Sequence, residues 1–212
     1  MAKSMAEFNT MSELILEKAK ALVIVAHPDD ETIWMGGTIL KFPDIQWTIF
    51  SLCRASDLDR APKFKKVCQL YGARCIIEDL EDEEIMNLKT SVSAIESIIK
   101  KKIRGKPFTY LFTHGYNGEY GHVRHRGVAR AARQMIKSHY LIAKSFFNFH
   151  YQHDERKDLG KPALNADVEV NLSNKLLSAK KRMIRDVYGF KKTSFEYKSC
   201  GQRETFKLVK PR

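Results

Sequence analysis

The chain has 212 residues, of which 43% are hydrophobic, and a formal net charge of +12. This length suits one compact domain with a sizeable core, and no apolar run approaches the roughly 20 residues of a membrane-spanning helix. The first nine residues lack the apolar segment and small-residue cleavage site of a secretory signal, so we expect a cytoplasmic protein. The charge favours anionic partners, but no nucleic-acid-binding motif accompanies it, so we interpret it as solvated basic helix faces and do not expect nucleic acid as a partner.

Apolar segments that fit strands alternate along the chain with segments of helical spacing. Thr10 as N-cap and Glu13 as its capping-box partner predict a first helix that ends near Ala19. Strands are predicted over residues 22–26, 47–53, 75–77, 108–112 and 145–149, with helices over 62–72, 88–103 and 124–136. This alternation predicts an α/β, Rossmann-like three-layer sandwich, in which a mostly parallel sheet has helices on both faces.

The C-terminal third has a different composition. Polar residues 153–161 predict an exposed loop, Val168 and Val170 alternate like a strand, and residues 173–188 have helical spacing. Residues 199–212 form a basic segment that we interpret as a short tail packed through Phe206 and Leu208. We therefore expect a single domain over residues 1–212, with a motif core at about 20–150 and a C-terminal helix and tail at 173–212. The oligomeric state stays open.

No C-x-x-C spacing is present, and the cysteines are predicted to be free: Cys53, Cys68, Cys75 and Cys200.

Two clusters of polar residues each follow a predicted strand. Ala26-His27-Pro28-Asp29-Asp30-Glu31 follows the apolar run 22–25, and Tyr120-Gly121-His122-Val123-Arg124-His125 comes after the strand 108–112. The carboxyl ends of parallel strands are where α/β sheets bind ligands. Zinc in a hydrolytic site takes three protein N or O ligands and leaves a fourth position for water, and the two clusters can supply such a set. The sequence therefore predicts a Zn²⁺ site, although other divalent metals also bind N and O ligands of this kind.

These motifs resemble those of the zinc-dependent de-N-acetylases of the PIG-L or LmbE-like family, which share an A-H-P-D-D-E motif at a strand end and a later G-H-x-x-H motif. The match extends to Gly36-Gly37-Thr38 and to residues 118–122, and covers about residues 20–150. The resemblance implies that the metal ligands are His27, Asp30 and His125. It also implies that Asp29 is the catalytic carboxylate, that Tyr120 and His122 act near the oxyanion, and that the substrate contacts are Arg54 and either Asp79 or Asp82.

Elementary chemistry agrees with these roles. Adjacent residues at a strand end point apart, so Asp29 and Asp30 can act differently, one on the metal and one as general base for its water. Zinc lowers the pKa of a bound water to about 7, which lets a carboxylate accept its proton at neutral pH. His122 and His125 are three residues apart and share one helix face if a helix begins there, so His125 can bind metal while His122 serves as an electrostatic or acid group.

The predicted function is that of a metal-dependent deacetylase, an amide hydrolase that removes the N-acetyl group from an N-acetylglucosamine-type sugar in a glycan, glycolipid or glycoside. Lys63 and Lys65 stand where family members often have Arg-x-x-Glu, and Val123-Arg124 replaces a frequent proline; the added positive charge fits an anionic or phosphorylated substrate. Two alternatives remain open. One is an inactive basic module that binds anionic glycan or nucleic acid, and the other is a metal amidase that acts on a non-sugar conjugate.

Glu31 and His114 allow two interpretations each, and Trp34 is interpreted as a core residue. Glu31 either caps a helix N-terminus or orients a metal-bound histidine. His114 either lines the pocket or, as we favour, satisfies a backbone carbonyl. Trp34 is expected in the core, close enough to the first motif to wall the pocket.

Overall fold

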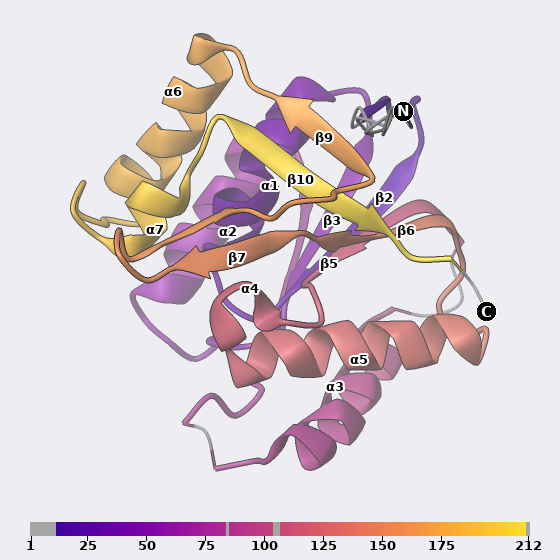
Figure 1. Cartoon of the computed structure of the whole chain (residues 1–212). Coiled ribbons are helices and arrows are strands. Elements are labelled where there is room, and N and C mark those ends of the chain that lie inside the picture. The colour runs from indigo at the N-terminus through magenta and orange to yellow at the C-terminus, as the bar shows by residue number, and fades with distance from the viewer. Residues whose placement is uncertain (1–11, 84, 104–106, 211–212) are drawn as a thin grey trace, which may run out of the picture.

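The computed structural model describes residues 12–83, 85–103 and 107–210. In this part of the chain, eight strands form one sheet in the order β1-β9-β10-β6-β5-β2-β3-β4, and β7 and β8 form a separate hairpin (Figure 1). The strands are β1 (Ser12–Glu13), β2 (Lys20–Val25), β3 (Gln46–Ser51), β4 (Arg74–Ile77), β5 (Phe108–Thr113), β6 (Ala143–Phe149), β7 (Tyr151–Asp154), β8 (Leu159–Pro162), β9 (Val168–Asn171) and β10 (Arg203–Leu208). From β4 to β6 all neighbours are parallel, whereas β10 runs antiparallel to both β6 and β9. The predicted Rossmann-like α/β fold is confirmed.

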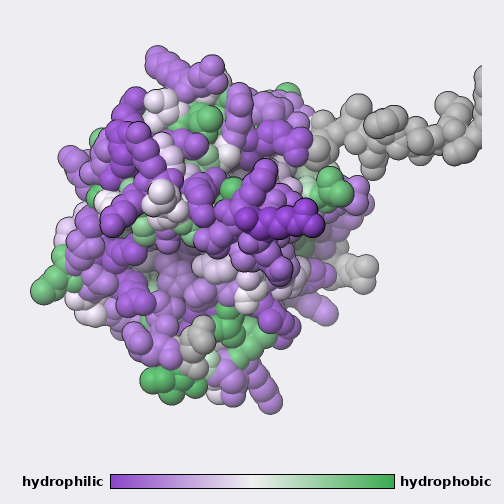
Figure 2. All heavy atoms as spheres, turned by 60° about the vertical axis from the view of Figure 1, so that its left-hand side comes forward, coloured by the Kyte–Doolittle hydropathy of each residue, from purple (hydrophilic) through white to green (hydrophobic). Residues whose placement is uncertain are grey.

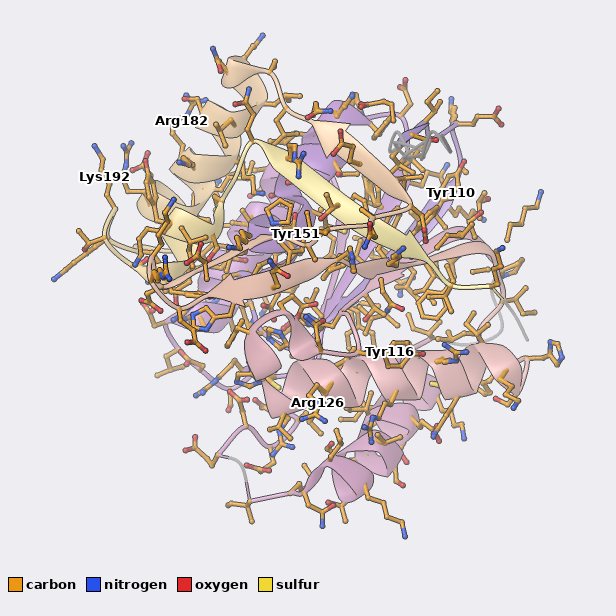
Figure 3. The ribbon with its side chains drawn as sticks, in the orientation of Figure 1. Tyr110, Tyr116, Arg126, Tyr151, Arg182 and Lys192 are labelled. Carbon is orange, nitrogen blue, oxygen red and sulfur yellow. The ribbon has the colours of Figure 1, made fainter. Side chains whose placement is uncertain are left out.

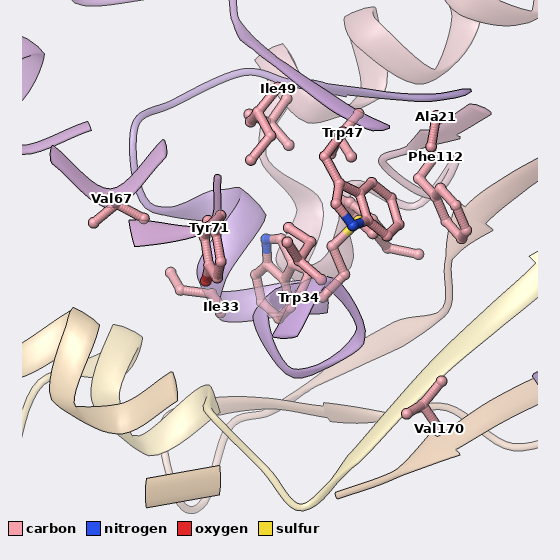
Figure 4. Packing of buried hydrophobic residues seen from close by; sticks show 14 of the residues in the cluster. Ala21, Ile33, Trp34, Trp47, Ile49, Val67, Tyr71, Phe112 and Val170 are labelled. Atoms are coloured by element: carbon pink, nitrogen blue, oxygen red, sulfur yellow. The ribbon is translucent and has the colours of Figure 1, made fainter. Parts of the chain in front are cut away.

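Helices cover both faces of the sheet. Figure 1 shows α3 and α5 together on one side, and α1, α2, α6 and α7 on the other. The helices are α1 (Asp30–Lys41), α2 (Arg60–Leu70), α3 (Leu88–Lys102), α4 (Gly118–Gly121), α5 (Val123–Lys137), α6 (Asn174–Arg182), the π-helical turn η1 (Met183–Val187) and α7 (Phe195–Ser199). Each face has its own apolar core, and Figure 4 shows Trp34, Trp47 and Phe112 in the larger one.

The central strand β2 explains where a binding site can form. Five of its six residues, Ala21 to Val25, are fully buried, as expected of a parallel strand covered on both faces. From β2 the chain passes through α1 to β3 on one side, while β5 pairs with β2 on the other. The strand order therefore reverses beside β2, and the crevice at the carboxyl ends of β2 and β5 is the usual ligand position in such sheets.

The predicted first helix is wrong where the structure describes it. Thr10 and Met11 lie outside the described residues, as do residues 1–9, on which the expectation about a secretory signal rested. Ser12–Glu13 is a strand parallel to β9, and residues 14 to 19 are not helical. Leu14 and Leu16 are buried and Ile15 is exposed, which is the two-residue period of an extended segment rather than that of a helix.

Two C-terminal predictions are also corrected. The predicted exposed loop 153–161 contributes to the hairpin of β7 and β8, and the predicted tail contains β10, which lies inside the sheet between β9 and β6. β10 carries the polar residues Glu204 and Thr205, both fully buried, so its sequence lacks the apolar run of a core strand. All four cysteines are free, as predicted. Among the described helices, none is long and apolar enough to cross a bilayer.

Arg182 and Lys192 are exposed basic residues, whereas Arg124 and Lys180 are fully buried. Arg182 and Lys192 point away from the body of the protein in Figure 3, and hydrophilic residues dominate the face in Figure 2. The interpretation of the net charge as solvated helix faces therefore fits Arg182 at the end of α6, but not Lys192, which is in a turn, nor the buried Arg124 and Lys180.

Candidate metal centre and active site

The three predicted metal ligands converge at the carboxyl end of β2. His27 Nδ1 lies 3.2 Å from both Asp30 Oδ2 and His125 Nε2, and the last two atoms are 3.3 Å apart. Ligand atoms of a tetrahedral zinc site with bonds of about 2.0 Å lie about 3.3 Å from one another. The two nitrogens and the oxygen therefore form a triangle of the size that one face of such a site requires. The surrounding His/Asp cluster, in which His122 groups with His27 and His125, and His114 with Asp30 and His125, fits a metal site.

Local structure holds His27 and Asp30 in place. Asp30 is the first residue of α1, and its Oδ2 accepts a hydrogen bond from the backbone N–H of His27 at 2.9 Å. Its other oxygen, Oδ1, accepts one from the indole N–H of Trp34, one helical turn later, also at 2.9 Å. Both oxygens of Asp30 are thus oriented, and the bond from Trp34 was not anticipated from the sequence. Trp34 is fully buried and also lines the cavity, in agreement with its prediction.

In each histidine of the triangle, the ring nitrogen that faces away from the triangle contacts a carboxylate. His27 Nε2 lies 2.8 Å from Asp82 Oδ1, and His125 Nδ1 lies 2.7 Å from Glu119 Oε2. Arg54 in turn donates to Asp82 at 2.7 Å. Carboxylates in this position fix the tautomer and ring orientation of metal-binding histidines. Glu119 lies within the matched segment 118–122, but its contact with His125 was not predicted; a carboxylate six residues before a candidate ligand was the available signal.

His114 lies beneath the triangle and stacks on His125, with ring centroids 3.8 Å apart. The backbone N–H of Ala26 donates to its Nε2 at 3.0 Å, so this nitrogen carries no hydrogen, and Nδ1 donates to Glu119 at 2.8 Å. The favoured structural interpretation fits, except that the backbone partner is an amide N–H rather than a carbonyl. The ring of His114 therefore packs against the ring of His125.

Asp29 occupies a strained position at the N-terminus of α1. Its φ of 122° is rare for a residue with a side chain, and Arg54 and Glu119 also have positive φ. Strain of this kind concentrates at functional sites. Asp29 Oδ2 accepts from Arg60 at 2.8 Å, while Oδ1 has no hydrogen-bond partner among the described residues. Burial and the charge of Asp30 raise the pKa of Asp29 well above its usual value, although Arg60 opposes this. The sequence did not reveal the contact with Arg60.

Glu31 takes the first of its two predicted roles. Its Oε2 accepts from the N–H of Asp29 at 3.1 Å, and its Oε1 accepts from the hydroxyls of Thr32 and Tyr188. Glu31 thus stabilises the start of α1. Burial raises its pKa to about 7.

His122 and Tyr120 lie beside the triangle. His122 Nδ1 accepts from the N–H of Arg124 at 3.2 Å and caps α5, so the hydrogen of a neutral ring is on Nε2. Burial and the nearby His125 and His27 lower the pKa of His122 to about 4, which keeps the ring neutral. Burial raises the pKa of the Tyr120 phenol, which keeps it protonated. Both side chains can therefore donate a hydrogen bond.

The triangle is at one end of a cavity of about 440 Å³. Its lining is mostly polar and consists of His27, Pro28, Asp29, Asp30, Ile33, Trp34, Arg54, Asp57, Arg60, Asp82, Tyr120, His122, Phe195 and Glu196. The structure therefore brings most of the predicted site residues to one cavity. The two exceptions are His125, which is fully buried and reaches the site through the triangle, and Asp79, which accepts from the N–H and hydroxyl of Ser56. Asp79 lines an adjoining depression that shares Arg54, Asp57 and Asp82 with the cavity.

Comparison with known proteins agrees with this geometry. Residues 22–136 match the PIG-L family, described as GlcNAc-PI de-N-acetylase. An uncharacterized protein, L374, of Acanthamoeba polyphaga mimivirus is 25% identical over 130 residues, which span 53% of this chain and 56% of that protein. The chain thus covers about half the length of this relative.

Several solved structures have the same fold. The N,N'-diacetylchitobiose deacetylase of Pyrococcus horikoshii has a TM-score of 0.63 and 17% identity, over 91% of this chain and 84% of its own. The A40926 pseudoaglycone deacetylase Dbv21 has a TM-score of 0.63 and 14% identity, over 92% and 99%. The hydratase GalB of Pseudomonas putida KT2440 has a TM-score of 0.62 and 14% identity, over 91% and 97%, so the fold alone does not define a reaction. From the match over more than half of its length, the chain belongs to the PIG-L family of de-N-acetylases.

Proposed function

We propose that this chain is a zinc-dependent deacetylase that hydrolyses the N-acetyl amide of an N-acetylglucosamine-type sugar. The observation that carries the proposal is the triangle of His27 Nδ1, Asp30 Oδ2 and His125 Nε2, with sides of 3.2 to 3.3 Å, at a cavity that Asp29 also lines. Family membership supports the class of reaction.

His27, Asp30 and His125 would hold the zinc ion, which supplies a Lewis acid and a water with a pKa of about 7. Asp29 is the proton carrier. Arg60 fixes its Oδ2, which leaves Oδ1 to accept the proton of the attacking water. The oxygen of that water bonds to the acetyl carbon, and the protonated Asp29 carboxyl then gives the proton to the amine nitrogen. Burial and Asp30 raise the pKa of Asp29, which favours this second step, while Arg60 opposes the rise and so favours the ionised form that the first step needs. The scissile bond is then the C–N bond of the amide, and acetate and the free amine are the products.

His122 and Tyr120 stabilise the oxygen of the acetyl group. The Nε2–H of His122 and the hydroxyl of Tyr120 are the donors that line the cavity next to the triangle. Donors fixed in advance on the oxygen that gains charge commonly contribute a factor of about 10² to 10³ each in rate.

The cavity also bears on the substrate. Tyr120 and Phe195 pack together and provide an apolar wall for the face of a sugar ring, and the buried Trp34 packs against both of them. The two cationic side chains of the lining, Arg54 and Arg60, each already pair with a carboxylate. A neutral acetylated sugar is therefore the first substrate to test, and a phosphorylated one is the comparison.

The test is an amine-release assay with zinc-loaded protein on N-acetylglucosamine, N,N'-diacetylchitobiose, a phosphorylated N-acetylglucosamine and a set of acetylated amino acids. The proposal expects release from at least one sugar, and release that is at least about 10²-fold slower with the Asp29→Asn variant. Release only from acetylated amino acids would identify a non-sugar amidase. Sugar binding without release by the zinc-loaded protein would indicate a binding module, and either result would overturn the proposal.

A further inference from the structure

Helix α1 contains a kink one residue after Trp34. Met35 has a φ of −149°, outside the helical range. In a straight helix, the N–H of Thr38 would donate to the carbonyl of Trp34. Here the N–H of Thr38 donates to Glu204 Oε2 at 2.6 Å, and the carbonyl of Trp34 accepts from the hydroxyl of Tyr151 at 2.8 Å. Residues of the C-terminal part of the chain thus satisfy both groups that the kink frees.

Glu204, on β10, caps the second half of α1. Its Oε1 also accepts from the N–H of Gly37 at 2.8 Å, and its Oε2 from the hydroxyl of Thr38 at 2.6 Å. Lys180 donates to Oε1 at 2.7 Å, and neither charged side chain is exposed to solvent. A buried ion pair is costly unless hydrogen bonds satisfy it fully, and Glu204 has four donors.

The absence of side chains at Gly36 and Gly37 leaves room for Tyr71 and Leu172 to pack against α1 next to the kink. A Cβ on Gly37 would lie 2.3 to 2.9 Å from side-chain atoms of Leu172, and one on Gly36 would lie 2.6 Å from the hydroxyl of Tyr71. The sequence motif therefore corresponds to close packing around the kink.

Trp34 connects the kink to the metal triangle through two hydrogen bonds. Its carbonyl is held by Tyr151, and its indole N–H donates to Asp30 Oδ1. Because this bond occupies Oδ1, Oδ2 is the oxygen that faces His27 and His125. The backbone conformation at residues 34 and 35 thus determines how Asp30 is presented.

We infer that Glu204, paired with Lys180, is a positioning residue for the candidate metal ligand Asp30, acting through the kink in α1 and through Trp34. Both residues lie outside the segment that matches the family, residues 22–136. The inference rests on the metal site of the proposed function.

Zinc affinity, measured without substrate by competition with a chromogenic chelator, tests the inference. Glutamine has one acceptor oxygen where Glu204 uses two, so Glu204→Gln leaves part of the second half-helix uncapped. Loss of indirect support for a metal ligand typically weakens metal binding by about 10- to 100-fold, and we expect a loss near the lower end. Glu204→Gln combined with Lys180→Met removes the buried unpaired ammonium; it should recover thermal stability but keep the weakened zinc binding.

Two further variants separate positioning from folding. Phe206→Leu, in the core on the same strand, should lower thermal stability and leave zinc affinity unchanged. Tyr151→Phe removes only the hydroxyl on the carbonyl of Trp34, should fold in every case, and should weaken zinc binding measurably. If zinc affinity returns together with stability in the double variant, or is unchanged in Tyr151→Phe, the role is structural and the inference is overturned. If the wild-type protein binds no zinc, the proposed function itself fails.

Discussion

The surroundings of two adjacent carboxylates, Asp29 and Asp30, shift their pKa values in opposite directions. Burial opposes ionisation of both, but His125, whose Nε2 lies 3.3 Å from Asp30 Oδ2, holds the pKa of Asp30 well below its usual value. Asp29 lies beside the charge of Asp30, and burial and this charge raise its pKa despite Arg60. Groups whose environments separate their pKa values in this way commonly divide the work of acid–base chemistry. These surroundings support the proposed division of roles, in which Asp30 binds the metal and Asp29 carries the proton.

Asp29→Asn keeps the shape of the side chain and removes its ability to accept a proton. We expect acetate release to fall by about 10²- to 10⁴-fold, the usual contribution of a positioned general base. Zinc affinity should stay close to that of the wild type, because Asp29 is not part of the triangle. Turnover and zinc binding measured on the same preparation check this, and undiminished turnover would rule out Asp29 as the base.

Asp82 and Asp79 form a matched pair for a second substitution. Asp82 contacts His27 Nε2, whereas Asp79 holds Ser56 outside the cavity. Asp82→Asn should weaken zinc binding by about 10- to 100-fold through loss of the carboxylate behind His27. Asp79→Asn should leave it unchanged in the same chelator titration. Equal effects of the two substitutions would show that the contact with His27 does not orient a metal ligand.

At the scale of elements, local signals in the sequence predicted the parts whose contacts are short-range. The helices predicted over 62–72, 88–103 and 124–136 appear as α2, α3 and α5 with small shifts at their ends. β10 was missed because its place in the sheet depends on β6 and β9, far away in sequence, and because Glu204 makes the strand look polar. The contacts of Arg60 with Asp29 and of Glu119 with His125 were also missed, because they depend on how the chain folds around the site, which no local pattern in the sequence shows.

Gly37 tests the packing around the kink in α1. An alanine there would place its Cβ within 3 Å of Leu172, which is buried and has little room to move. Overpacking of this kind typically costs about 1 to 3 kcal/mol in the free energy of unfolding. Gly201→Ala is the control, since the nearest atom to its added Cβ is 3.8 Å away. Chemical denaturation of both variants measures the difference, and equal stabilities would mean that Leu172 yields freely.

For the whole molecule, the metal site connects distant parts of the chain. His27 follows β2, and His125, 98 residues later, is in α5. A ligand that binds only the folded state stabilises it, by about 2.7 kcal/mol at a free concentration of 100 times its dissociation constant. We therefore expect zinc to raise the melting temperature and a chelator to reverse this. The melting temperature of the His125→Ala variant should not change when zinc is added. A wild-type melting temperature that is the same with and without zinc would contradict the proposed metal site.

The most direct test of a zinc-dependent deacetylase is a titration of the metal-free protein with zinc, with acetate release from the best acetylated sugar followed at each addition. The proposed site predicts that activity rises in proportion to added zinc and levels off at one equivalent per chain. Acetate release that does not depend on zinc, or no release after one equivalent is bound, would contradict it.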